Sequence, residues 1–155
     1  MNDHYLNSWK FWGSKVALIY GQQLVVLRKD DIPGLHSAGM WDLPGGRSEA
    51  GESPIQCLVR ETKEEVGLDI EGYPIEWMRE YPSSSACDQS EYFMVVKISK
   101  RDTEKMTLGD EGQDLQLMTL SKFVSLDNAI THLVVGVQDY LNDMNHLRNR
   151  SVCLK

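Results

Sequence analysis

The sequence predicts one domain, residues 1–155, that combines β-strands and α-helices in an α+β or α/β fold. Three observations lead to this prediction. Two β-prone runs near the amino terminus flank a glycine, a strongly capped helix follows a glycine-rich turn, and apolar residues recur at helical spacing near the carboxyl end. With 155 residues, of which 41% are hydrophobic, the chain can bury a core without disulfides.

The first predicted elements form a β-hairpin. The runs KVALIY and QLVVLR, within residues 15–28, are interrupted at Gly21, which suits a tight turn. A polar loop punctuated by proline and glycine is expected over residues 29–40. A short extended segment at 41–43 then leads into a turn at 44–46.

A helix is predicted from Pro54 to about Val66. Ser53 can cap its first amides, proline is tolerated at the first helical position, and Gln56 can complete a capping box. Gly67 stands where a left-handed cap is usual. The predicted apolar face of this helix carries Ile55, Val59, Thr62 and Val66, with Leu58 at its edge.

The remainder of the chain alternates strands with polar segments. Three further strands are expected, at 75–81, 91–98 and 115–120. A turn-rich stretch at 82–90 and a charged loop at 100–112 separate them. Residues 128–147 predict a final amphipathic helix, because apolar side chains recur there at helical spacing: Ile130, Leu133, Val134, Val137, Leu141 and Met144.

Charge and cysteine content disfavour several classes of protein. The chain has 23 acidic against 16 basic residues, so a nucleic acid polymer is not an expected partner. Its three cysteines, Cys57, Cys87 and Cys153, are odd in number and lack metal-site spacing, which favours a reducing cytoplasm over a disulfide framework. Residues 1–12 contain no apolar run that could act as a signal peptide or membrane span, so neither export nor membrane insertion is expected.

Three glutamates, Glu61, Glu64 and Glu65, share one side of the predicted helix within roughly 6 Å along its axis. Like charges at this spacing weaken a helix by a few tenths of a kcal/mol per pair. For three glutamates alone, a solvated acidic face is the plain interpretation. Their position beside a glycine-rich turn, which offers backbone carbonyls, favours a site where a hard divalent cation handles phosphates.

The spacing of these residues resembles the box of the Nudix hydrolase family. That pattern is Gly, five residues, Glu, seven residues, Arg-Glu, an apolar residue, any residue, Glu-Glu, any residue, Gly and an apolar residue. The matching positions here are Gly46, Glu52, Arg60, Glu61, Thr62, Glu64, Glu65, Gly67 and Leu68. Only Thr62 departs from the pattern, since an aliphatic side chain is usual there. The segment Trp41 to Gly46 resembles the family's lead-in to the box, and Glu111-Gly112-Gln113 resembles a downstream loop of MutT-like members.

The resemblance implies the Nudix fold, a mixed β-sheet sandwiched between α-helices, and a cofactor, Mg²⁺, for which Mn²⁺ can substitute. The implied metal ligands are Glu61, Glu64, Glu65 and the carbonyl of Gly45. Glu52 would lie close by, tied to the loop and helix or to a metal-bound water, with an ordinary first-turn glutamate as the alternative. Arg60 would orient a glutamate by ion pairing.

The implied activity is that of a pyrophosphohydrolase, in which metal-activated water attacks phosphorus in a nucleoside diphosphate linked to another group. Glu64 and Glu111 both stay open as the general base. A small nucleotide is the expected substrate, and the MutT-like loop favours nucleoside triphosphates. The stretch Tyr81 to Ser84 followed by Ser90-Glu91 faintly resembles ADP-ribose pyrophosphatases, which keeps ADP-ribose or a nucleotide sugar as an alternative. A Nudix-fold binding module without turnover is a further alternative, disfavoured because the box carboxylates are retained, and a homodimer is left open.

Other reactive or aromatic residues are interpreted as structural. Cys57 is expected to pack rather than to act as a nucleophile. The histidines are scattered, so no catalytic role is expected for His4, His36, His132 or His146. Three aromatic residues near the first strand are expected to pack, with a base-stacking surface as the alternative: Trp9, Trp12 and Tyr20.

Overall fold

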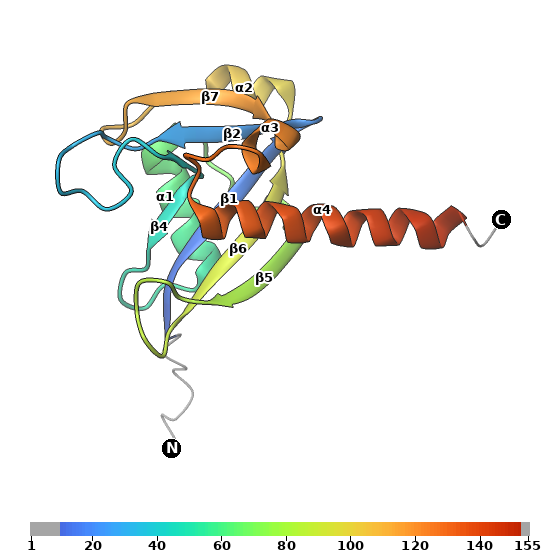
Figure 1. The fold of residues 1–155 in the computed structure, drawn as a ribbon, viewed down its shortest axis with the longest axis horizontal. Coiled ribbons are helices and arrows are strands. Elements are labelled where there is room, and N and C mark those ends of the chain that lie inside the picture. The colour runs from blue at the N-terminus through green and yellow to red at the C-terminus, as the bar shows by residue number, and fades with distance from the viewer. Residues whose placement is uncertain (1–9, 153–155) are drawn as a thin grey trace.

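The computed structural model describes residues 10–152, in which a mixed β-sheet is flanked by helices, so the predicted fold class is confirmed (Figure 1). The strands are β1 (Phe11–Tyr20), β2 (Gln23–Arg28), β3 (Trp41–Asp42), β4 (Gly45–Arg47), β5 (Trp77–Pro82), β6 (Ser90–Lys97) and β7 (Asp114–Thr119). The helices are α1 (Pro54–Val66), α2 (Lys100–Lys105), α3 (Leu120–Val124) and α4 (Thr131–Val152).

Strand β1 is the centre of the sheet. The strand order is β3-β2-β1-β6-β5, with β4 paired to β1 and β7 paired to β2. The β1–β6 pair is parallel, whereas the other strand pairs are antiparallel. Because β1 is long, it pairs with β2 near its carboxyl end, at Ile19 and Tyr20, and with β4 near its amino end, at Gly13–Lys15. Two segments distant in sequence therefore share one edge of β1.

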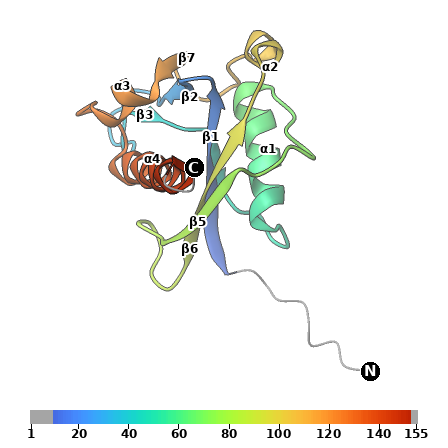
Figure 2. The same ribbon diagram turned by 90° about the vertical axis from the view of Figure 1, so that its right-hand side faces the viewer.

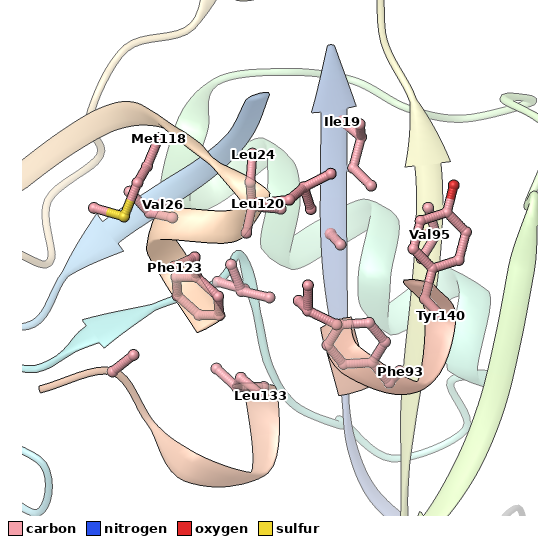
Figure 3. Close-up of a cluster of buried hydrophobic side chains, with 14 residues drawn as sticks. Ile19, Leu24, Val26, Phe93, Val95, Met118, Leu120, Phe123, Leu133 and Tyr140 are labelled. Atoms are coloured by element: carbon pink, nitrogen blue, oxygen red, sulfur yellow. The ribbon is translucent and has the colours of Figure 1, made fainter. Parts of the chain in front are cut away.

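Helices α1 and α4 cover opposite faces of the sheet (Figure 2). Successive side chains of β1 alternate between these faces. Ala17 and Ile19 join the buried cluster on the α4 side, which Figure 3 shows, and Val16 and Leu18 join the cluster on the α1 side. Each face of β1 thus has its own core, which anchors one helix to each side of the strand.

Helix α1 has the predicted bounds and caps. The Ser53 hydroxyl accepts a hydrogen bond from the Gln56 N–H (3.2 Å), and the Gln56 side chain accepts one from the Ser53 N–H (2.8 Å). Gly67 ends the helix with φ at 67°. These signals are local, since each cap is made by residues within three positions of the helix end.

The predicted apolar face of α1 is partly wrong, because Ile55 is 47% exposed. The buried positions are Pro54, Cys57, Leu58, Thr62 and Val66. The Ser14 hydroxyl donates to the Pro54 carbonyl (2.8 Å), and the Cys57 thiol lies 3.5 Å from the Gly46 carbonyl. These contacts with β1 and β4 orient the helix so that Leu58, which was placed at the edge, points into the core.

Two loops were predicted wrongly. Residues 44–46 were expected to form a turn, but Gly45–Arg47 is strand β4, held by pairing with β1. The first part of the expected loop at 100–112 is helix α2, capped by Ser99, whose hydroxyl accepts from the Asp102 N–H. Helix α3 was not predicted, although Thr119 caps it by accepting from the Lys122 N–H.

The other elements agree with the sequence prediction to within a few residues. The three later strands lie within two positions of their expected ends, and the final helix starts at Thr131 and continues to Val152. In residues 10–152, no helix has both the length and the apolar character needed to cross a membrane. Cys57 is buried and Cys87 is exposed, both as free thiols, whereas His4, Trp9 and Cys153 lie outside the described residues.

Thr62, the one departure from the family pattern, is fully buried, and its hydroxyl has no hydrogen-bond partner. A buried hydroxyl without a partner costs stability, so we expect Thr62→Val to raise the free energy of unfolding by about 1 kcal/mol. Ser14→Ala is the matched control, since the Ser14 hydroxyl is equally buried but bonded to Pro54, and we expect that change to destabilise. Urea denaturation measures both, and a less stable Thr62→Val protein would contradict the prediction.

Candidate functional site

A cleft of about 1030 Å³ opens where the amino-terminal half of β1, β4 and α1 meet the loops at 29–40, 84–85 and 110–112 and the start of α4. Five of the predicted site residues line it: Gly45, Glu61, Glu64, Glu65 and Glu111. The other two, Arg60 and Glu52, bind each other next to it. The structure therefore brings residues from a strand, a helix and a distant loop to one concave surface.

The guanidinium of Arg60 organises most of the acidic groups on α1. Its Nε and Nη2 donate to the two carboxylate oxygens of Glu52 (2.6 and 3.0 Å). Its Nη1 donates to Glu61 (2.8 Å) and to Glu64 (3.2 Å), and its Nη2 also donates to the Arg47 carbonyl (3.0 Å). The hydrogen bond from Arg60 lowers the pKa of Glu52, despite partial desolvation. One cation thus offsets the repulsion among carboxylates that the sequence places close together.

Glu65 lies apart from this cluster and is in a different electrostatic state. Burial raises the pKa of Glu65 to about 7, although the charge of Lys15 and a hydrogen bond from the Gly45 N–H (2.7 Å) act in the opposite direction. With this pKa, Glu65 is partly protonated at neutral pH, because its surroundings compensate the negative charge poorly. It faces β4, where a further positive charge would stabilise it.

Two glycines of β4 allow the carboxylates to approach the strand. A Cβ on Gly46 would lie 2.6 Å from the carboxyl carbon of Glu61, and a Cβ on Gly45 would overlap the Ser14 carbonyl oxygen. Gly45 also has φ at 127°, which side chains rarely adopt. The glycine pair is therefore a requirement of close packing between β1, β4 and α1.

Lys15 and Asp42 line the same cleft, although sequence reasoning did not select them. The Lys15 ammonium donates to the Asp42 carboxylate (2.8 Å) and to the Leu43 carbonyl (3.0 Å). Burial opposes the charge of Lys15, but Asp42 and Glu65 outweigh it, so the pKa of Lys15 lies above its ordinary value. The available signal was a lysine at the start of the run KVALIY, whose other residues are mainly apolar.

Two histidines also line the cleft, His36 from the 29–40 loop and His132 from the start of α4. The His132 ring lies 3.8 Å from the Glu91 carboxylate, and burial lowers the pKa of His132 despite that neighbour. His132 is therefore mainly neutral at pH 7.

The aromatic residues near β1 divide between the cleft and the core. Trp12 lines the cleft, and the Arg47 guanidinium lies 4.4 Å from the centre of its ring. Tyr20 packs against the α1-side core. Cys57 is fully buried, and burial raises the pKa of its thiol to about 11, which is consistent with the predicted packing role.

The cleft offers the oxygen donors that a hard divalent cation prefers, in the carboxylates of Glu61, Glu64 and Glu65. Among residues 10–152, no three His, Cys, Asp or Glu side chains are gathered closely enough to hold a metal ion. Each of the three carboxylates binds a protein group instead. Arg60 donates to Glu61 and Glu64, and the Gly45 N–H donates to Glu65. The three carboxylates fit a hard cation in kind and line one cleft, and the Glu64 side chain is 59% exposed beside Arg60.

Comparison with known proteins gives one family and several relatives. A family model described as NUDIX domain matches residues 13–135. An 8-oxo-dGTP diphosphatase of Proteus vulgaris is 49% identical over 35 residues, 23% of this chain and 31% of that protein. A putative 8-oxo-dGTP diphosphatase of Bacillus subtilis (strain 168) is 40% identical over 54 residues, 35% of this chain and 32% of that protein. The chain thus spans about a third of the length of the curated relatives that it matches.

Solved structures resemble the fold over most of the chain. An Ap4A hydrolase binary complex from C. elegans has a TM-score of 0.67 at 17% identity, covering 86% of this chain and 98% of that one. A MutT protein from Methanosarcina mazei Go1 also has a TM-score of 0.67 at 17% identity, covering 89% and 97%. At these identities the likeness shows the fold alone.

The raised pKa of Glu65 predicts how stability changes with pH in the absence of metal. Folding favours the protonated form, so the stability that Glu65 contributes is fully present below about pH 4.5 and is lost as pH rises through about 7. Glu65→Gln cannot lose a proton, so we expect this variant to be more stable than wild type by about 3 kcal/mol at pH 8 and similar at pH 4.5. Urea denaturation with a chelator at both pH values measures the difference. An equal difference at the two pH values would show that Glu65 has no raised pKa.

Proposed function

The chain belongs to the Nudix family, and from that premise we propose that it hydrolyses a nucleoside diphosphate linked to another group, with nucleoside triphosphates as the preferred class. Members of this family typically depend on a divalent cation. The observation that carries the proposal is the gathering of Glu61, Glu64 and Glu65 with the Gly45-Gly46 pair on one wall of the cleft. Three neighbouring carboxylates repel a polyphosphate, and a bound cation would offset that repulsion.

Mg²⁺, or Mn²⁺ in its place, would be held by Glu61, Glu64, Glu65 and the carbonyl of Gly45. A cation bound there would supply positive charge to offset the charge on the phosphoryl oxygens. The protein's own contribution is orientation: Arg60 fixes Glu61, and Glu52, which accepts both from Arg60 and from the Glu49 N–H (2.8 Å), fixes Arg60. Glu52 is thus proposed as a support of the ligand set.

Two carboxylates are proposed as alternatives for accepting the proton of the attacking water. Glu64 lies on α1 and is mostly exposed, and Glu111 lies in the loop that follows α2. Both line the cleft. Near Glu111, the Gly109 amide donates a hydrogen bond to the Glu65 carbonyl of α1 (2.8 Å). A Cβ on Gly109 would overlap the Glu64 carbonyl oxygen, so this close contact requires glycine. The loop carrying Glu111 is thereby held against α1.

The remaining walls of the cleft suit the rest of a nucleotide. Arg28, Lys29 and Arg47 supply positive charge, and Leu35 and Met40 supply apolar surface. The curated relatives are named as 8-oxo-dGTP diphosphatases, which favours a purine nucleoside triphosphate over ADP-ribose or a nucleotide sugar.

The test is a panel of nucleotides with Mg²⁺, scored by product identity. We expect a nucleoside triphosphate, with 8-oxo-dGTP the first to try, to give the nucleoside monophosphate and pyrophosphate. Faster cleavage of ADP-ribose, to AMP and ribose 5-phosphate, would show that nucleoside triphosphates are not the preferred substrate class. If the protein bound nucleotides but hydrolysed none of them, it would be a binding module and not an enzyme.

Repeating this panel with the variant Glu61→Gln/Glu65→Gln tests the proposed metal site. This change removes two metal ligands at nearly constant size, so we expect turnover to fall by at least about a hundredfold. Mg²⁺ at a hundredfold excess over its Kd stabilises the wild type by about 2.7 kcal/mol, and that gain should disappear in the variant. Glu71→Gln/Glu104→Gln, at two exposed positions away from the cleft, is the matched control. Equal Mg²⁺-dependent shifts in melting temperature for all three proteins would place the cation elsewhere.

A further inference from the structure

The ion pair between Lys15 and Asp42 joins β1 to β3 inside the cleft. Both side chains are largely buried, at 21% and 10% exposure, and the two residues are 27 positions apart in the sequence. A buried ion pair seldom stabilises a fold more than apolar side chains of similar size, because both charges must leave water. The pair is therefore not expected to add much to the stability of the fold.

All the hydrogen bonds of this pair converge on one short segment. The Lys15 ammonium donates to the Leu43 carbonyl (3.0 Å) as well as to Asp42. The same oxygen of Asp42 accepts from the Leu43 N–H (2.7 Å). Both polar groups of the Leu43 backbone are thus fixed by the ion pair. Directly after Leu43, the Pro44 carbonyl accepts from the Val16 N–H (2.8 Å).

The segment held in this way ends at the candidate metal site. Gly45 follows Pro44 and pairs with Lys15 itself in the β1–β4 ladder. The Gly45 N–H donates to the Glu65 carboxylate (2.7 Å). Because Gly45 packs against the Ser14 carbonyl without room for a Cβ, a small displacement of this backbone would move the contact with Glu65. A continuous series of contacts therefore connects the ion pair to a proposed metal ligand.

We propose that Lys15 and Asp42 are positioning residues, which fix residues 43–45 so that Gly45 presents its backbone groups and Glu65 to the cation. This inference rests on the proposed function. It differs from a direct role of Lys15 in binding substrate phosphate, which would act on substrate affinity rather than on metal affinity.

The test is the double variant Lys15→Met/Asp42→Leu, which removes both charges and leaves the net charge unchanged. Without metal, we expect a melting temperature within about 4 °C of wild type. The Kd for Mn²⁺, taken from the metal-dependent rise in melting temperature, should weaken at least about tenfold. With the nucleotide that the wild type hydrolyses fastest, kcat at saturating Mn²⁺ should fall by at least about tenfold, with KM changed less than about threefold.

The matched control is Lys97→Met/Glu76→Gln, which removes an ion pair outside the cleft between Lys97 of β6 and Glu76, the residue before β5. We expect this control to keep the Kd for Mn²⁺, kcat and KM of wild type. Two single variants add a further comparison. Lys15→Met should weaken metal binding, whereas Lys15→Arg should preserve most of the metal affinity, because arginine retains a cation with several donors.

Three results would overturn the inference. Wild-type metal affinity and kcat in the double variant would show that the pair is only structural. A raised KM in the double variant, with unchanged kcat and metal affinity, would show that Lys15 contacts the substrate instead. If the double variant does not fold, Asp42→Asn tests the inference instead, because it keeps an oxygen acceptor at the same size. The inference requires this variant to weaken the Kd for Mn²⁺ by at least about threefold, so a smaller change would overturn it. A wild type that shows neither an Mn²⁺-dependent shift nor hydrolysis would instead refute the proposed function, on which the inference depends.

Discussion

The ion-pair network of Arg60 is the interaction on which the rest of the site depends. Glu61, Glu64 and Glu65 are forced together by the spacing of one helix, and without a cation their charges repel. Arg60 neutralises Glu61 and Glu64 in the structure, while Glu52 holds the guanidinium from the other side. The helix can therefore fold with its carboxylates close together. Glu65, which lies beyond the reach of this arrangement, remains the least neutralised member, with a pKa of about 7.

Close approach between α1 and the strands is the second constraint, and it explains why glycines surround the carboxylates. Gly46 leaves the space that Glu61 occupies, Gly45 packs on β1, and Gly109 packs on the carboxyl-terminal half of α1. A side chain on Gly46 or Gly109 would overlap α1, and one on Gly45 would overlap β1. Packing and chemistry are thus joined, because the contacts that bury one face of α1 also set the distance between its carboxylates and the backbone of β4.

The sequence predicted those features that depend on neighbouring residues. The bounds of α1 follow from Ser53, Gln56 and Gly67, and the order of the box glutamates on that helix follows from its pitch. Features set by distant residues were missed or wrong. Residues 44–46 were expected to turn because of their proline and glycines, whereas pairing with β1, some 30 positions earlier, makes Gly45–Arg47 a strand. The exposure of Ile55 and the Lys15–Asp42 pair likewise depend on tertiary contacts that no local pattern contains.

A crystal structure of the protein soaked with Mn²⁺ tests the central claim most directly, because the anomalous signal of manganese locates the ion independently of activity. The account predicts an anomalous peak in contact with the carboxylates of Glu61 and Glu65 beside Gly45, with the Arg60–Glu52 ion pair preserved. A manganese ion bound elsewhere in the molecule, with Glu61 and Glu65 left without a cation, would contradict it.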